Sequence, residues 1–212
     1  MFKLTPMLFR ELDVLSRNEA GTPLVVEEYP MEQPGFAYFS PWAKKVYLNV
    51  KINLTGLLCE KSLIVIANQI PIELLREAGV ELDWSKIPIN LIYHFFVYHE
   101  IYHKFYDYFE IELFASRSKP ATDILRDREN RMLFSFAREM RADRFAWRRL
   151  FPRGPLPIHA RHKEMVQRAR TFMKEYKQYF PKKPRWTSTP ISTNLDEMVP
   201  AQHAEKGIPF VV

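Results

Sequence analysis

The sequence predicts an α+β fold in which a small antiparallel sheet or hairpin packs on one buried helix and on further long helices. Residues 45–51 alternate apolar and polar side chains, which is typical of a strand with one buried face. Residues 91–109 are apolar or aromatic on nearly every side, which indicates a central buried helix. Thr122 or Asp123 can cap a long helix that runs to about Leu150.

The N-terminal part is expected to begin with a helix. Thr5 is a typical N-cap residue, and Pro6 stands at the first helical position. An apolar stripe then predicts an amphipathic helix over residues 6–17. Residues 24–29 form a short β-prone run that follows a break at glycine and proline.

The segment before the buried helix is expected to contain the sheet. Residues 36–39 and 45–51 are interpreted as the two arms of a hairpin. Residues 63–67 are apolar enough for a buried strand or a helix, and periodicity does not decide between them. Residues 71–78 are interpreted as a short helix that stops at Gly79.

The C-terminal part divides into helices and a tail. Residues 116–120 are predicted as a loop, and residues 158–179 as another helix. From residue 181 onward proline, serine, threonine and charged residues dominate, which indicates an extended or partly disordered tail. The sequence therefore predicts one domain over residues 1–180 and a proline-rich tail over residues 181–212.

Composition restricts the classes of protein to which the chain can belong. The hydrophobic content of 47% is that of a folded globular protein, and a single cysteine, Cys59, excludes an internal disulfide and a cysteine-based zinc site. The N-terminus shows no secretion leader, and no run of eighteen apolar residues is present. We therefore expect a cytoplasmic protein without a membrane partner.

The net charge of +6 allows two interpretations. Attraction to nucleic acid or to an acidic partner is one. A solvated surface is the other and the preferred one, because most lysines and arginines are spread along the chain and interleaved with acids.

The strongest motif is the pentapeptide at residues 99–103, which has the H-E-x-x-H pattern of zinc metallopeptidases. On a helix, residues four apart share a face, so His99 and His103 can bind one ion. Glu100 lies beside them and can contact water at the metal. The alternative is a buried helix with two hydrogen-bonded core histidines. Metal is favoured because buried imidazoles and a carboxylate are costly unless a cation satisfies them.

A catalytic zinc normally takes a third protein ligand. The extended pattern with a third histidine is excluded, because Phe109 occupies that position. Asp107 continues the stripe of His103, but three ligands on successive turns of a straight helix converge poorly on one ion.

The better candidates lie on the next long helix. Glu139 and Asp143 are four residues apart and share a face. Glu139 can reach across as the third ligand, and Asp143 can accept the free N–H of a ligand histidine. The alternative is that both are surface acids paired with neighbouring arginines of the same helix: Arg138, Arg141 or Arg144.

The sequence HEIYH, followed by EMRADRFAWRRLFP, resembles the gluzincin clan of zinc metallopeptidases and, more narrowly, the ImmA/IrrE-like metallopeptidase domain. The resemblance covers roughly residues 35–152. Relatives with the same minimal core, including SprT-like and peptidase-M48-like domains, remain open. Two features depart from the family pattern: the zinc helix is unusually aromatic, and no helix-turn-helix module is evident.

The resemblance implies a minimal zincin-like core and peptide hydrolysis by a zinc-activated water. His99, His103 and Glu139 would bind Zn²⁺, and Glu100 would act as general base. The oxyanion donor stays open among His94, Tyr106, His159 and His162. The substrate would add as an extended strand beside residues 45–51.

The resemblance also implies a protein or peptide substrate, for example a DNA-binding regulator such as a transcriptional repressor. The competing hypothesis is a non-catalytic, metal-stabilised regulatory or binding module, such as one encoded by a virus or mobile element. Direct nucleic-acid binding is a third, less favoured hypothesis.

Overall fold

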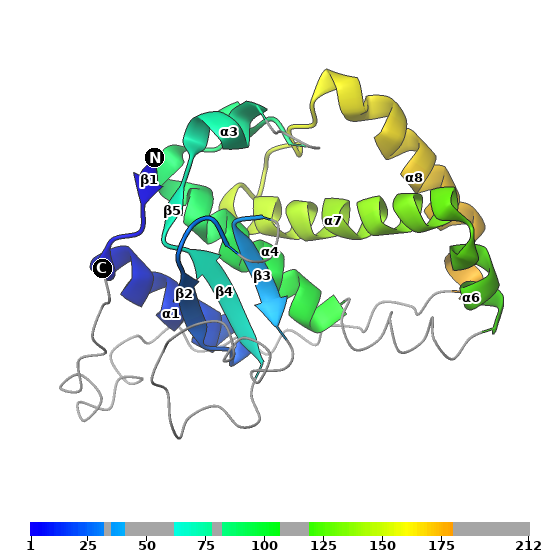
Figure 1. Ribbon diagram of the computed structural model, residues 1–212. Helices are drawn as coiled ribbons and strands as arrows, with labels where there is room; N and C mark the ends of the chain where they lie inside the picture. The colour runs from blue at the N-terminus through cyan, green and yellow to red at the C-terminus, as the bar shows by residue number, and fades with distance from the viewer. Residues whose placement is uncertain (32–34, 41–61, 78–81, 107–118, 180–212) are drawn as a thin grey trace. The chain divides into compact units, whose positions relative to one another are not determined.

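Two helices, α4 (Ile92–Tyr106) and α7 (Arg128–Leu150), pack against each other at the centre of the fold (Figure 1). The computed structural model describes residues 1–31, 35–40, 62–77, 82–106 and 119–179. All the described residues belong to one compact unit, Met1–Lys182. The predictions for residues 45–51 and for the tail concern residues outside the described ranges. Within those ranges, no helix is long and apolar enough to cross a membrane.

A three-stranded sheet lies beside α4. Its order is β2 (Leu24–Glu27), β4 (Leu63–Ala67) and β3 (Ala37–Ser40). β4 pairs with β3 antiparallel and with β2 in parallel, so the predicted small antiparallel sheet or hairpin is in fact a mixed sheet.

The central strand β4 is the segment whose type the sequence left undecided. All five of its residues are buried: a neighbour strand lies on each edge, and Ile64 and Ile66 belong to the main core with residues of α4. Such a strand has no polar face and therefore shows no alternation. Pairing with β2 and β3, and not its own sequence pattern, makes this segment a strand.

The first helix, α1 (Pro6–Ala20), confirms the predicted helix and extends it by three residues. The hydroxyl of Thr5 accepts a hydrogen bond from the backbone N–H of Leu8 at 3.2 Å. Gly21 ends the helix in the left-handed region, with φ of 60°, which glycine adopts without steric strain. The actual stop signal is therefore this glycine.

Short elements connect the sheet to α4. Strands β1 (Phe2–Lys3) and β5 (Gln69–Ile70) pair antiparallel in a second small sheet. Helix α3 (Ile72–Glu77) lies within the predicted short helix. Two single turns follow, η1 (Trp84–Lys86) and η2 (Ile89–Leu91), and the second leads into α4.

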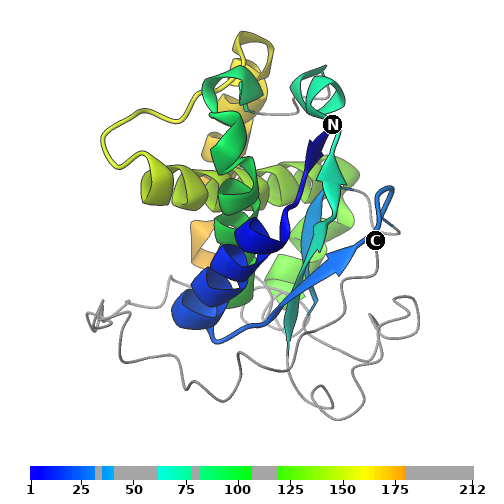
Figure 2. The same ribbon diagram turned by 90° about the vertical axis from the view of Figure 1, so that its left-hand side faces the viewer.

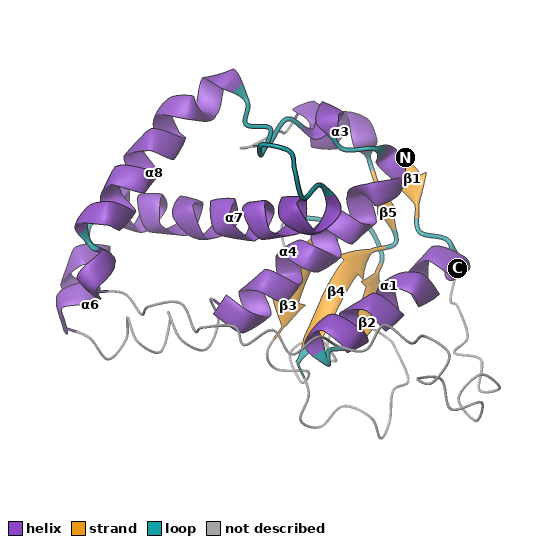
Figure 3. Ribbon diagram, turned by 180° about the vertical axis from the view of Figure 1, so that it is seen from behind, coloured by secondary structure: helices purple, strands orange, loops and turns teal. Residues whose placement is uncertain are grey.

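Helices α1 and α4 lie on the same side of the three-stranded sheet (Figure 2). α7 packs on α4, and Figure 3 shows both of these helices in front of the strands. The main core forms where α4 meets the sheet, around Tyr93, Phe95 and Ile64, none of which is measurably exposed. The central position of α4 explains its apolar sequence on nearly every side.

The long helix predicted from about residue 122 is in fact two helices. α6 covers Lys119–Arg126, so Lys119 and Pro120 are helical and do not belong to a loop. Asp127 interrupts the helix with an extended backbone, and its carboxylate accepts a hydrogen bond from the backbone N–H of Asn130 at 2.8 Å. The N-cap of α7 is therefore Asp127, four to five residues later than expected.

The helix predicted over residues 158–179 is shorter than expected. α8 covers Lys163–Glu175, and single 3₁₀ turns flank it at η3 (Ala160–His162) and η4 (Lys177–Tyr179). α6, α7 and α8 share a second apolar core that includes Leu133, Ala169 and Phe172.

Candidate metal centre

The two histidines of the pentapeptide lie on one face of α4. They are four residues apart, and their Nε2 atoms are 2.9 Å from each other. Both side chains are 13% exposed. The spacing on the helix therefore brings two nitrogen donors to one point near the surface.

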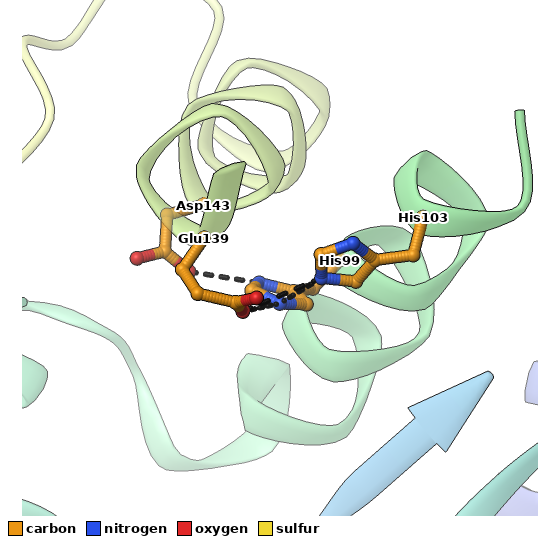
Figure 4. A network of polar contacts seen from close by, with 4 residues as sticks. All are labelled: His99, His103, Glu139 and Asp143. Carbon is orange, nitrogen blue, oxygen red and sulfur yellow. Dashed lines mark hydrogen bonds and ion pairs between the residues drawn. The ribbon is translucent and has the colours of Figure 1, made fainter. Parts of the chain in front are cut away.

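Glu139 of α7 completes a triangle of donor atoms with these histidines. Its Oε2 lies 3.1 Å from Nε2 of His99 and 3.4 Å from Nε2 of His103 (Figure 4). Ligands at about 2.0–2.1 Å from a tetrahedral zinc stand about 3.3 Å from one another. The triangle thus has the dimensions of three zinc ligands, and the three residues form a group that could hold a metal ion.

Asp143, one turn further along α7, fixes the tautomer of His99. Its Oδ1 lies 2.8 Å from Nδ1 of His99, so the ring donates its Nδ1–H to the carboxylate (Figure 4). The lone pair of a neutral His99 then remains on Nε2, and it faces the other donors of the triangle. Three electron-rich atoms converge there, and only a cation or a shared proton can satisfy them.

The pKa values of His99 and Glu139 also indicate that positive charge is favoured at this site. Burial alone would lower the pKa of His99, but hydrogen bonds to Asp143 and Glu139 raise it well above its ordinary value. Burial would raise the pKa of Glu139, but hydrogen bonds to His103 and His99 lower it strongly. Positive charge is therefore favoured inside the triangle.

Glu100 lies on α4 directly after His99 and is 6% exposed. Burial raises the pKa of its carboxyl group, while the charges of His99 and His103 and a hydrogen bond from the backbone N–H of Phe39 oppose that rise. A carboxylate with a raised pKa beside two imidazoles is suited to accept and release a proton. The sequence does not predict the contact with Phe39, because a backbone N–H leaves no residue-specific signal.

The other candidate residues lie elsewhere or outside the described ranges. His94 contacts Glu11 of α1, with its Nε2 2.9 Å from Oε1. His162 accepts a hydrogen bond from Nε of Arg161 at 2.9 Å. His159 is the residue before η3 and is not part of the donor group. Asp107 and the side chain of Tyr106 belong to the part of the chain that is not described.

The structure thus brings together His99, His103, Glu139 and Asp143 from two helices that are far apart in sequence. Comparison of the chain with known protein families, with curated proteins and with solved structures found no match. The chemistry of this site is therefore inferred from its own residues and geometry.

Proposed function

We propose that the protein is a zinc-dependent peptidase that hydrolyses a protein substrate, resembling the gluzincin and ImmA/IrrE-like metallopeptidases. The observation that carries the proposal is the triangle formed by Nε2 of His99, Nε2 of His103 and Oε2 of Glu139, with sides of 2.9, 3.1 and 3.4 Å. These residues would hold the ion with two imidazoles and one carboxylate, the number of protein ligands that catalytic zinc sites use.

The donor set favours zinc over the hard cations. Calcium and magnesium take oxygen ligands almost exclusively, whereas two of the three donors here are imidazole nitrogens. His99 is held in the metal-binding tautomer by Asp143, which is the arrangement that supports histidine ligands in zinc proteins.

Zinc held by this triangle would supply a Lewis acid that lowers the pKa of water toward about 7. The residues of the chain perform the remaining steps. Glu100 takes the proton of the attacking water and passes it to the departing amine of the cleaved peptide bond. Burial raises the pKa of this carboxyl group above its ordinary value, which makes it a stronger proton acceptor than an exposed glutamate.

The exposure of the site fits a reaction with a large substrate. The side chain of Glu139 is 42% exposed, so the triangle reaches solvent on the side of α7. Glu100, at 6%, lies on the inner side. Water and a peptide can thus approach from outside while the base stays shielded. The protein substrate, for example a transcriptional repressor, remains a prediction from the resemblance.

The test combines metal analysis with one substitution. The purified chain is expected to hold one zinc per molecule, and Glu100→Gln is expected to keep the zinc and the unfolding temperature. Cleavage of a peptide library should fall about 10²- to 10⁴-fold in Glu100→Gln, because the general base is lost. Glu129→Gln, an exposed acid on α7, is the matched control and should cleave normally.

A different outcome would point to the competing hypothesis. A protein that holds zinc but cleaves no peptide in either form would be a metal-stabilised binding module. A protein that binds no zinc at pH 7 would remove the basis of both hypotheses.

A further inference from the structure

The positive charge of the protein is concentrated in α7 and α8. Residues 128–175 hold 13 of the 31 lysines and arginines but only five of the 25 aspartates and glutamates. This segment therefore carries +8, whereas the whole chain carries +6, so the remainder is slightly acidic. The net positive charge therefore comes from this segment and is not spread evenly along the chain.

Three of these arginines share one face of α7. Arg141, Arg144 and Arg148 are three and four residues apart, so they follow one stripe of the helix over about 10 Å. The stripe lies about half a turn around the helix from Glu139 and Asp143. The metal triangle and the arginines thus occupy opposite faces of α7.

A fourth arginine comes from α8. Figures 1 and 3 show α8 on the side of α7 away from α4, and α8 packs on α7 through Ala169 and Phe172. Arg170 follows Ala169 directly. Besides partial burial, the nearby positive charge of Arg170 lowers the pKa of Arg144, as do the charges of Arg148 and Arg141. We call the following four residues the arginine cluster: Arg141, Arg144, Arg148 and Arg170.

The arginine cluster has no counterion among the described residues. Other arginines of the same region are paired: Arg149 lies 3.0 Å from Glu19, and Arg168 contacts Glu129. No member of the cluster makes such an ion pair in the described ranges, and all but the half-buried Arg141 are exposed.

The described acids of α7 and α8 contact other residues or lie on another side of their helix. Glu139 and Asp143 bind the histidines of α4, and Glu129 contacts Arg168. Helical spacing places Glu164 and Glu175 more than about 100° around α8 from Arg170. No acid of the described ranges is therefore placed to relieve the repulsion among the four arginines.

We propose that the arginine cluster is a docking surface for the phosphate backbone of a nucleic-acid duplex. Guanidinium groups bind phosphate oxygens in pairs of parallel hydrogen bonds. A duplex presents one negative charge per about 1.7 Å of its axis, so several phosphates can reach four arginines held within about two helical turns. The recognition is independent of base sequence, because phosphate contacts position a protein and do not read bases.

A duplex fits the cluster better than an acidic peptide does. The cluster lies where two helices pack and offers charge alone, whereas recognition of a peptide also uses apolar anchors. The exposed large apolar side chain of α7, Met132, is nine residues before Arg141. The partner must therefore be dense in charge and need no apolar contact.

The experiment measures binding of the zinc-treated full chain to a fluorescent DNA duplex of about 20 base pairs at several salt concentrations. Arg144→Gln/Arg170→Gln removes two phosphate contacts. We expect the slope of log Kd against log salt to fall by about 2 and the affinity near 0.1 M salt to fall at least about tenfold. Arg10→Gln/Arg76→Gln removes the same charge from exposed positions of α1 and α3 and should leave the slope unchanged.

Binding of other polyanions and of further variants tests whether a duplex is the partner. An RNA duplex that binds equally supports recognition of the backbone, whereas tighter binding to single-stranded DNA or equal competition by polyglutamate overturns the choice of a duplex. Equal slopes for the two double variants overturn the cluster as the site. Arg144→Lys/Arg170→Lys keeps the charge and should retain the slope, which separates charge loss from misfolding. Binding by Glu100→Gln should equal that of the native chain, because this surface is independent of the proposed peptidase.

Discussion

The two faces of α7 differ in the sign of their charged residues and in whether these residues are paired. On the face toward α4, the carboxylates of Glu139 and Asp143 are 42% and 6% exposed and contact imidazole rings within 3.4 Å. On the opposite face, Arg144 is surrounded by other arginines, which lower its pKa in addition to burial. One helix therefore has an acidic face with partners and a basic face that lacks counterions in the described part of the chain.

This difference separates internal from external roles. The acidic face is completed by groups of the same chain, and its three converging donors could hold one metal ion. The basic face has no counterion among the described residues, and the proposed partner of this face is another molecule. Substitutions on the acidic face should therefore have larger effects than substitutions on the basic face.

Replacement of the metal-ligand candidate Glu139 should abolish metal binding. Glu139→Ala leaves two histidines, and the zinc content should fall from one per chain to near zero by elemental analysis. The stabilisation by zinc, about 4 kcal/mol at a thousandfold excess over Kd, should vanish in denaturant titrations. Glu129→Ala, on the same helix but paired with Arg168, should retain both. Full zinc content in Glu139→Ala would refute the triangle as a metal site.

Loss of the charge on Asp143 should weaken the same site without destroying it. Asp143→Asn can still accept the Nδ1–H of His99, but the neutral amide makes the ring a poorer ligand. Zinc affinity, measured by chelator competition, should fall about 10- to 100-fold. Asp123→Asn, at an exposed aspartate paired with Arg126, provides the control. An unchanged affinity would mean that Asp143 does not orient His99.

The stability of the metal-free protein should fall as pH rises, whereas the stability of the zinc form should rise. Burial lowers the pKa of His99, but bonds to Asp143 and Glu139 raise it well above 6.5. The stabilisation by protonated His99 is complete below pH 6.5 and is lost as pH rises through the folded-state pKa. Urea titrations of chelator-treated protein should show stability falling, by at most about 1.4 kcal/mol per pH unit for one proton.

Zinc should reverse this trend, because protons compete with the metal for its ligands. Stability of the zinc form should therefore rise with pH over the same interval. Parallel pH profiles for the two forms would contradict the assignment of His99 as a ligand.

A single substitution on the basic face should have the smallest effect. Arg144→Gln relieves repulsion among exposed like charges and should raise the free energy of unfolding by up to about 0.5 kcal/mol. The gain should shrink with added salt, since screening weakens the repulsion. Arg10→Gln on α1 should show no gain. A loss of stability in Arg144→Gln would indicate that packing of its side-chain stem outweighs its charge.

Local patterns predicted those parts of the fold that depend on neighbouring residues. Thr5 and Pro6 identified the start of α1, because capping involves atoms only three residues apart. The prediction missed Asp127, since a run of helix-compatible residues on both sides concealed a cap between α6 and α7. It also assigned an antiparallel sheet, because β4 carries no sign of its parallel partner β2.

The sequence by itself determined which side chains could act together on one helix. Residues four apart share a face, and this holds for His99 with His103 and for Glu139 with Asp143. Only the tertiary structure decided that these two pairs meet and which atoms face one another. The reason is distance along the chain: helical periodicity acts over one turn, whereas the contact from His99 to Glu139 spans 40 residues and depends on how α4 and α7 pack.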